Sequence, residues 1–369
     1  MIRAVLICGD VVGAPGGAGQ VTKNELMALK EVFGANEVSW LELADVRPAV
    51  YAGLDVPYLW DYFALAQLHE PRFRQLEHAH IYSGCYTETV RYLRSRGMTV
   101  SYTCPAHARG PSLKERQLRG FGANLPHIDD DILWAQHKQG YLDADVVIVP
   151  SSHSEDFLRS EGVTNLVRIP HGIEAIPEQM APFPEEFTVG YLGGLGPDKG
   201  VSYLVDAWAA LGWEDARLII AGEGSQQWAP YIQARVGKGK ICLPGYIPDV
   251  ADFYNAITVY VQPSVAEGFG IEIIEAMSYG RPVIASTGAG ASDAIWFGTE
   301  HIIHVPSTPG WRVPPGDTEA LADAIRWTRE HVSSLIYMGG VGRQVARNYL
   351  WEKIRLKYIG VFQELLRGH

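Results

Sequence analysis

The sequence predicts an α/β protein of two domains, each built on a parallel sheet covered by helices. The chain has 369 residues, more than one hydrophobic core usually supports, and its 47% hydrophobic content is enough to fill two cores. Short apolar runs alternate with helical segments, which is the pattern of parallel sheets. After Gly172 the segment EAIPEQMAPFPEE carries three prolines and few large apolar residues, so it is expected to separate the domains.

The strands that this pattern predicts fall into two series. In the first half they cover residues 3–8, 37–43, 80–83, 99–103, 146–149 and 166–169. In the second half they cover residues 187–192, 217–221, 258–262, 282–285 and 301–304. The predicted domains are therefore residues 1–173 and 188–351, joined by a linker at 174–187. Apolar residues on a helical spacing near the end predict an amphipathic helix over about residues 352–369.

Charge and cysteine content exclude several classes of protein. A net charge of −11 argues against nucleic-acid binding, because that affinity depends on cationic side chains. The four cysteines show no Cys-x-x-Cys spacing, which argues against a structural zinc site and a disulfide framework. No apolar run is long enough for a membrane span or a signal peptide, so we expect a cytoplasmic protein.

The most informative stretch is VYVQPSVAEGFGIEIIEAMSYGRPVIA, from Val259 to Ala285. It places Glu267 and Glu275 around a glycine-flanked turn that opens a helix. The unpaired N–H groups and the dipole of a helix start favour an anion such as a diphosphate. A carboxylate further along that helix can accept hydrogen bonds from a neutral diol such as a ribose. Two glutamates eight residues apart mean little alone in an acidic chain, so the surrounding residues decide the interpretation.

Those surrounding residues form a recognisable series. Pro263-Ser264, Glu267-Gly268-Phe269-Gly270, Glu275-Ala276-Met277, Gly280 and Pro282-Val283-Ile284-Ala285 occur in this order. The series closely resembles the Glu-x7-Glu signature of the retaining group 1 glycosyltransferases. The resemblance implies a GT-B architecture, in which two Rossmann-like domains face each other across a cleft and the C-terminal helix returns to the first domain. It also implies that Glu267 contacts the donor sugar, that the amides of Gly268, Phe269 and Gly270 hold the diphosphate, and that Glu275 binds the ribose.

A second match is GYLGGLGPDKG, Gly190 to Gly200, which resembles the turn that opens the second domain in this family. An arginine and a lysine of that turn usually hold the donor diphosphate. Lys199 matches the lysine, whereas Gly194 stands where the arginine is expected. A cationic contact to phosphate is worth more than a neutral hydrogen bond, so this difference bears on donor binding. The alternative for Lys199 is a solvated lysine in a turn.

Three further segments resemble the family less specifically. RLIIAGEGS resembles the second-domain strand ending in Gly-x-Gly, which implies that Gly222 contacts the donor. LPGYIPD resembles the loop that lines the base pocket, which implies that Tyr246 stacks on a base. Their alternatives are a tight turn and a packing residue. Gly16 and Gly17, in VVGAPGGAGQV, do not fit Gly-x-Gly-x-x-Gly but match a Gly-Gly loop that touches the donor from the first domain. A purely conformational loop is the alternative there.

His107 is the candidate reactive-centre side chain of the first domain. It follows the predicted strand 99–103, at the strand end that opens into the ligand crevice of such folds. The family often carries a histidine there that is directed to the donor sugar, and a structural histidine is the alternative. Arg109 could replace the missing diphosphate arginine. The span 91–119 has seven cationic side chains and one acid, either a patch for an anionic acceptor or a phospholipid surface, or solvated helix faces.

The predicted reaction is transfer of a sugar from a nucleoside diphosphate sugar to a hydroxyl with retention at the anomeric carbon. Glu267, His107 and Lys199 are the predicted catalytic residues. No metal is required by this arrangement and no convincing Asp-x-Asp or His/Asp cluster stands out to bind one, so the nucleotide sugar is the only co-substrate expected. Expected partners are that donor and a sugar, lipid-linked or small-molecule acceptor, with peripheral contact to the inner face of the membrane as an option and no nucleic acid. Two alternatives stay open: another GT-B activity (phosphorylase, epimerase or hydrolase) and a non-catalytic binding clamp. The base, donor sugar, acceptor, pathway and oligomeric state stay open too.

Overall fold

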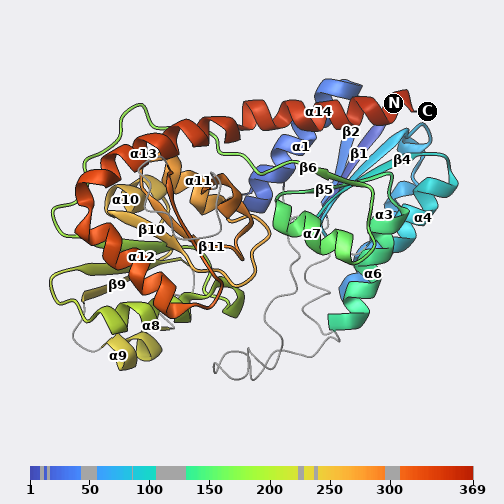
Figure 1. Ribbon diagram of the computed structural model, residues 1–369. Helices are drawn as coiled ribbons and strands as arrows, with labels where there is room; N and C mark the ends of the chain where they lie inside the picture. The colour runs from blue at the N-terminus through green and yellow to red at the C-terminus, as the bar shows by residue number, and fades with distance from the viewer. Residues whose placement is uncertain are drawn as a thin grey trace. The chain divides into compact units, whose positions relative to one another are not determined.

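The computed structural model describes residues 1–8, 12–14, 17–42, 56–84, 86–104, 130–222, 228–236, 240–295 and 308–368 (Figure 1). Within these residues the strands form two six-stranded sheets, and their pairings are parallel. The strand orders are β2-β1-β3-β4-β5-β6 and β12-β11-β10-β7-β8-β9. Each sheet belongs to its own compact unit, so the prediction of two α/β domains with parallel sheets is confirmed.

The first unit contains the described residues before Ile173 and the C-terminal segment from Trp351. Its elements are β1 (Ala4–Cys8), α1 (Gly17–Phe33), β2 (Val38–Glu42), α3 (Val56–Leu68), η2 (Pro71–Phe73), β3 (His78–Tyr82), α4 (Thr87–Ser95), β4 (Thr99–Thr103), α6 (Asp130–Asp143), β5 (Val146–Val149), α7 (Ser152–Ser160), β6 (Leu166–Arg168) and α14 (Trp351–Arg367). Successive residues of β1 point to opposite faces of the sheet. Leu6 therefore packs under α1 and α14, whereas Ile7 packs against α3, α4 and α6.

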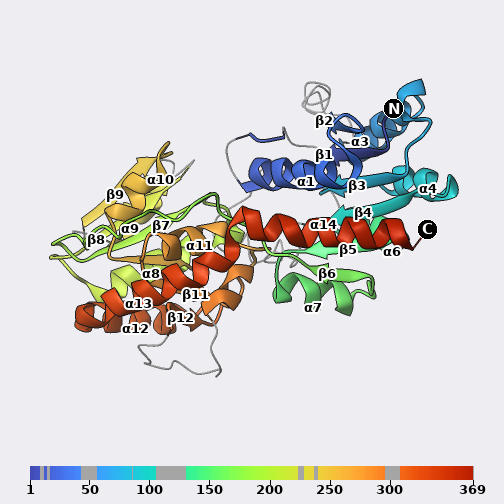
Figure 2. The ribbon, with the colours of Figure 1, turned by 90° about the horizontal axis from the view of Figure 1, so that it is seen from above.

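Helices α1 and α14 lie side by side, although more than 300 residues separate them in sequence (Figure 2). Trp351, Ile354, Tyr358 and Phe362 of α14 are buried, and their spacing places them on one face of the helix. The C-terminal helix thus completes the core of the first unit.

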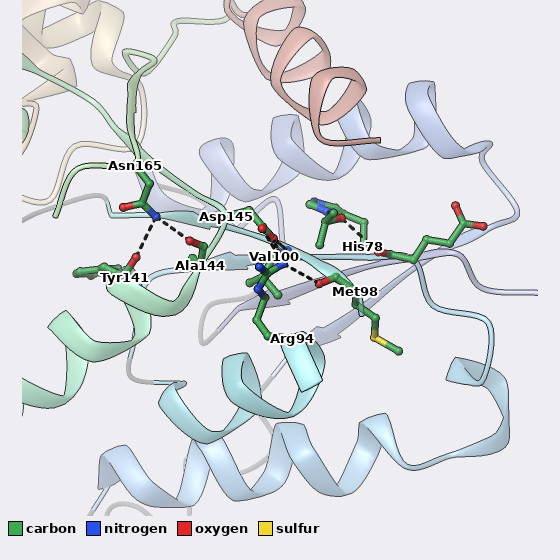
Figure 3. Close-up of polar contacts among 10 residues, drawn as sticks. His78, Arg94, Met98, Val100, Tyr141, Ala144, Asp145 and Asn165 are labelled. Carbon is green, nitrogen blue, oxygen red and sulfur yellow. Dashed lines mark hydrogen bonds and ion pairs between the residues drawn. The ribbon is translucent and has the colours of Figure 1, made fainter. Parts of the chain in front are cut away.

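Polar side chains form hydrogen bonds with backbone groups near the ends of β4 and β5 (Figure 3). The Asp145 carboxylate accepts the Val100 amide at 2.7 Å and the Arg94 guanidinium at 2.8 Å, which joins α4 to β4. The Asn165 amide donates to the carbonyls of Tyr141 and Ala144 at 3.1 and 2.8 Å, which satisfies carbonyls at the end of α6. β4, the strand that precedes His107 in the sequence, is therefore held at its start by the part-buried hydrogen bond from Val100 to Asp145.

The second unit runs from Ile173 to Leu350. Its elements are β7 (Thr188–Leu192), η3 (Pro197–Lys199), α8 (Val201–Leu211), β8 (Arg217–Ala221), α9 (Ala229–Val236), β9 (Lys240–Gly245), α10 (Val250–Asn255), β10 (Val259–Gln262), α11 (Ile271–Ser278), β11 (Val283–Ser286), η5 (Gly290–Ile295), β12 (Gly310–Val313), α12 (Thr318–Glu330), α13 (Val332–Ala346) and η6 (Arg347–Tyr349). Helices α8, α9 and α12 pack on one face of the sheet, and α10 and α11 pack on the other.

Two arginines hold the proline-rich segment against the second unit. The buried Arg281 side chain donates to the carbonyls of Ala181 and Pro182 at 3.2 and 3.4 Å, and its guanidinium lies 5.1 Å from the Phe183 ring. Arg343 donates to further carbonyls of the segment. The segment predicted as a linker is thus packed on the second domain along part of its length.

The predicted strands agree with the observed ones to within about two residues, with three exceptions. β9 was not predicted, and residues 243–245, interpreted from the sequence as loop, are part of it. β9 alternates exposed and half-buried residues and contains Pro244, which is typical of an edge strand. β12 was also missed, because GWRV contains a glycine and an arginine. The strand predicted at 301–304 lies outside the described residues.

Candidate functional site

The loop between β10 and α11 carries the Glu-x7-Glu motif at the carboxyl edge of the second sheet. β10 is buried throughout, so the chain leaves the core at Gln262 and must turn before α11 begins. Gly270 makes that turn with a φ of 84°, a conformation that glycine adopts without strain. The carboxyl edge of a parallel sheet is where ligands bind in open α/β folds.

The backbone of this loop is fixed by the turn that follows β11. The Glu267 amide donates to the Gly288 carbonyl at 2.8 Å, and the Glu267 carbonyl accepts the Gly290 amide at 3.0 Å. The Phe269 carbonyl accepts the Ala291 amide at 2.6 Å, and the Phe269 ring is buried against Tyr349. Phe269 is thus a core side chain, and its predicted ligand contact rests on its backbone alone.

Lys199 and Glu267 are brought together, 68 residues apart in sequence. The Lys199 ammonium donates to Glu267 Oε2, and both side chains are mostly buried. The Asp198 carbonyl accepts the amides of Val265 and Ala266 at 2.7 and 3.2 Å, so the η3 turn is tied to the glutamate loop. Burial opposes the charge on Lys199, but Glu267 and the neighbouring acids outweigh it, and the pKa of Lys199 is raised. Lys199 therefore carries a positive charge at neutral pH.

Glu275 lies within α11, whereas Glu267 lies in the loop before this helix. Its Oε2 accepts a hydrogen bond of 2.9 Å from the hydroxyl of Tyr254, a fully buried residue of α10. Burial raises the pKa of the Glu275 carboxyl, and the bond from Tyr254 partly offsets that effect. The contact orients the carboxylate of a half-buried side chain.

Glu272 is a third acid of the site that the sequence analysis missed. It lies in the first turn of α11, and burial together with Glu267 and Glu275 raises the pKa of its carboxyl to about 7. Its Oε1 lies 3.8 Å from the position that a Cβ would take on Gly193, so it faces the turn after β7. The spacing of three residues from Glu275 is the signal that could have found it, because such residues share a helix face.

Buried tyrosines line the floor of the site, and these were also missed. The Tyr260 hydroxyl donates to the Leu192 carbonyl at 3.1 Å and contacts Gln262, while the Tyr191 hydroxyl donates to the Gly194 carbonyl. Burial raises the pKa of Tyr191, Tyr254 and Tyr260 well above 10, so their hydroxyls act as donors. Tyrosine on a buried strand needs a partner for its hydroxyl, which was the available signal.

Gly222 and Gly194 differ in how much space surrounds the position of a Cβ. A Cβ on Gly222, which has a φ of 132°, would collide with the Gly193 carbonyl, so this position is fixed by close packing. Gly194 is exposed, and a Cβ there would meet nothing within 4 Å. Space for a longer side chain therefore exists at Gly194.

The other predicted residues are less constrained by the structure. The Tyr246 side chain is 67% exposed at the end of β9, beside the turn where the Gly222 amide donates to the Gly245 carbonyl at 2.8 Å. Gly17 begins α1. His107, Arg109 and Gly16 lie outside the described residues.

The described part of the cationic span 91–119 is largely neutralised. Arg91 pairs with Glu88 at 2.6 Å, and Arg94 pairs with Asp145 at 2.6 Å. The Arg96 guanidinium lies 5.9 Å from the Tyr92 ring. These contacts favour solvated helix faces for α4 over a patch for anions.

Clusters of metal ligands and membrane-spanning helices are both absent from the described residues. Among them, no group of three or more His, Cys, Asp or Glu side chains is placed to hold a metal ion. None of the helices in these ranges is long and apolar enough to cross a membrane.

Solved structures share the whole fold. Sucrose-phosphate synthase from Thermosynechococcus elongatus superposes with a TM-score of 0.76 at 22% identity, covering 100% of both chains. Anabaena Alr3699/HepE in complex with UDP superposes with a TM-score of 0.70 at 16% identity, covering 98% of this chain and 100% of that one. The chain thus has two Rossmann-like domains and the GT-B architecture.

Sequence comparison relates the second domain to known glycosyltransferases. Residues 186–331 match the family model described as Glycosyl transferases group 1. The phosphatidyl-myo-inositol mannosyltransferase of Mycobacterium leprae is 30% identical over 216 residues, 54% of each chain. The capsular polysaccharide biosynthesis glycosyltransferase CapM of Staphylococcus aureus is 27% identical over 185 residues, 47% of this chain and 46% of CapM. The chain spans about half the length of the curated relatives it matches.

Proposed function

We propose that this protein transfers a sugar from a nucleoside diphosphate sugar to an acceptor hydroxyl, with retention of the anomeric configuration and without a metal ion. The observation that carries the proposal is the contact between Lys199 and Glu267 at the start of α11, with Glu275 further along the same helix. A cation, a helix start and two carboxylates would thereby lie in the order that a diphosphate, a sugar and a ribose require.

The reaction follows from these groups. The bond from the anomeric carbon to the β-phosphate oxygen breaks while the acceptor oxygen forms its bond on the same face of the sugar. The acceptor proton passes to the departing phosphate oxygen. Lys199 and the amides at the start of α11 stabilise the negative charge on the leaving diphosphate, and Glu267 holds the sugar hydroxyls. His107 and the Gly16-Gly17 loop would approach the sugar from the first domain, and Tyr246 would stack on the base.

The names of similar proteins support a glycan or lipid acceptor. One relative is a phosphatidyl-myo-inositol mannosyltransferase, and another acts in capsular polysaccharide biosynthesis. A structure of Anabaena Alr3699/HepE holds UDP-glucose. We therefore propose a sugar or lipid-linked acceptor and a cytoplasmic site of action, with peripheral contact to the membrane where the acceptor is a lipid.

The test combines ligand binding with turnover. UDP, GDP, ADP and dTDP and their sugars are screened by thermal shift, because a specific ligand raises the unfolding midpoint by mass action. Transfer from the selected donor is then assayed with EDTA present, and the product anomer is determined by NMR. Glu267→Ala should cut turnover by a factor on the order of 10² or more while nucleoside diphosphate affinity stays within about threefold. His107→Ala is expected to behave in the same way.

A non-catalytic clamp is the second candidate, and Gly194 favours it. Without an arginine at this position, the turn after β7 offers the leaving diphosphate only Lys199 as a cation among the described residues. Tight binding of a nucleotide sugar with no transfer to any acceptor and no hydrolysis would select the clamp. An inverted product would overturn the retaining mechanism.

A further inference from the structure

The donor site holds more negative charge than a diphosphate tolerates. Among the described residues of this site, Lys199 is the cation that acts on Glu267 and Glu272, and Asp198 lies beside it, while Glu267 and Glu275 both act on Glu272. The diphosphate of a nucleotide sugar adds two further negative charges. A site with three ionised carboxylates would therefore repel the ligand that the fold and motif call for.

Glu272 is the acid whose position would allow it to reduce this repulsion of the diphosphate. Its Oε1 lies 3.8 Å from the position that a Cβ would take on Gly193, the residue that precedes Gly194, where the arginine is missing. The Tyr191 hydroxyl holds the Gly194 carbonyl, which fixes the turn that Glu272 faces. Glu267 and Glu275 each accept a side-chain hydrogen bond, whereas the Glu272 carboxyl receives none from another side chain among the described residues.

We propose that Glu272 binds the donor as a neutral carboxylic acid and donates a hydrogen bond to a diphosphate oxygen, in the place of the arginine absent at Gly194. The proposal rests on the proposed function. A neutral acid adds no negative charge, and its O–H bonded to an anionic oxygen forms a charge-assisted hydrogen bond.

Every element around Glu272 bears on its protonation. The groups that interact with it are Lys199 on η3, Tyr191 on β7, Tyr254 on α10, Tyr260 on β10, Glu267 on the loop and Glu275 on α11. Burial and the two acids favour the neutral form, whereas a backbone hydrogen bond and Lys199 oppose it. The resulting pKa of about 7 lies where the carboxyl can carry its proton at neutral pH. A diphosphate close to the carboxyl would raise this pKa further.

The experiment measures nucleoside diphosphate affinity against pH. Calorimetry between pH 6 and pH 8.5, with EDTA present, uses UDP, GDP or ADP, whichever binds the wild type most tightly. The variants are Glu272→Gln, which keeps the size and a donor, and Glu272→Ala, which removes both. Glu319→Gln is the matched control, because Glu319 is an exposed glutamate in the first turn of α12 in the same domain. The ligand's own titration is common to all four proteins and cancels in their ratios.

We expect wild-type affinity to fall about tenfold relative to Glu272→Gln as the pH rises from 6 to 8.5, because ionised Glu272 loses its donor and repels the phosphate. At pH 6, Glu272→Gln should match the wild type within about threefold, while Glu272→Ala binds about tenfold more weakly. Glu319→Gln should follow the wild type at every pH.

A constant ratio of wild type to Glu272→Gln across the pH range overturns the role of Glu272 and leaves the proposed function standing. Wild-type binding that requires added Mg²⁺ also overturns the role of Glu272, since a cation would then supply the missing charge, and it overturns the metal independence of the proposed transfer. Absence of binding by the wild type to all three nucleotides, with and without Mg²⁺, overturns the proposed function and this inference together.

Discussion

Each of the two domains contains a cluster of acids and hydroxyls, and the two clusters differ in how much of their hydrogen bonding is internal. In the first domain the fully buried Glu25 lies 3.3 Å from His80 and accepts a bond of 2.7 Å from Thr103. From His80 a chain of hydrogen bonds continues through Ser101, His78 and Thr99, with distances of 2.7 to 2.9 Å. Burial, with the neighbouring His80, lowers the pKa of His78 to about 3, so this ring stays neutral.

In the second domain the corresponding cluster is open on one side. The hydroxyls of Tyr191 and Tyr260 donate to backbone carbonyls, and the hydroxyl of Tyr254 donates to Glu275. The three glutamates of the site, Glu267, Glu272 and Glu275, remain partly accessible to solvent.

A polar network that is fully enclosed in a core serves the fold, since a missing partner there costs free energy. In the network of the first domain, Glu25 Oε2 is the carboxylate oxygen that finds no hydrogen-bond partner among the described residues. Carboxyl groups that are oriented by buried donors and still reach solvent can serve a ligand. The difference separates a structural polar cluster from a candidate site.

The largest expected effect is on the closed network of the first domain. His80→Ala should lower the free energy of unfolding of that domain by about 3–5 kcal/mol, because it strips Glu25 of a partner and leaves a cavity beside Phe362. Urea unfolding combined with hydrogen exchange of β3 and β4 measures the loss. His69→Ala, at an exposed histidine of the same domain, is the control. A loss below about 1 kcal/mol would show that the network is not structural.

The next effect concerns the open cluster and its ligand. Glu275→Gln should weaken nucleoside diphosphate binding by about 1–3 kcal/mol, because the charge that strengthens hydrogen bonds to a diol is removed. Folding should change little, since the amide oxygen can still accept the Tyr254 hydroxyl. Calorimetry measures the affinity. Unchanged affinity would place Glu275 with Glu25, as a structural acid.

A pH-dependent effect on stability is expected to distinguish Glu272 from Glu25 and Glu275. Folding raises the pKa of this carboxyl from its ordinary value of 4.5 to about 7, so Glu272 stabilises the fold below about pH 4.5, and this contribution is lost as the pH rises to about 7. The amide of Glu272→Gln does not titrate. The free energy of unfolding of this variant should therefore exceed that of the wild type by about 1–3 kcal/mol above pH 7. At pH 5 the two should differ much less. Unfolding midpoints between pH 5 and pH 8.5 test this, and a pH-independent difference would contradict the raised pKa.

The smallest expected effect on the fold is at Gly194. Gly194→Arg should change the free energy of unfolding by no more than about 0.5 kcal/mol, because a side chain there meets open space. The same variant should bind nucleoside diphosphate about tenfold more tightly through the added cation. Gly222→Ala is the contrasting variant and should destabilise the domain, because its Cβ collides with the Gly193 carbonyl. Weaker binding by Gly194→Arg would mean that an arginine competes with Glu272 instead of supplementing it.

Local sequence determined much of this protein. The buried strands are runs of apolar residues without alternation, and helices such as α4, α7 and α12 bury one apolar face, so these patterns could be recognised within a few residues. The same holds for Glu267 and Glu275, which belong to one continuous strand-turn-helix segment. Spacing along that segment sets their positions because Gly270 ends the loop and begins the helix.

Tertiary structure decided what required distant segments. Lys199 meets Glu267 across 68 residues, and Tyr254 of α10 reaches Glu275 of α11. The pKa of Glu272 depends on burial and on Lys199 and Glu267, which lie outside its own helix, and no local pattern predicts these neighbours. The edge strands β9 and β12 were missed for the same reason, since pairing with β8 and β11 stabilises segments whose own residues favour a strand only weakly. Periodicity and motif spacing are local properties, whereas burial, charge coupling and hydrogen-bond partners exist only after the chain has folded.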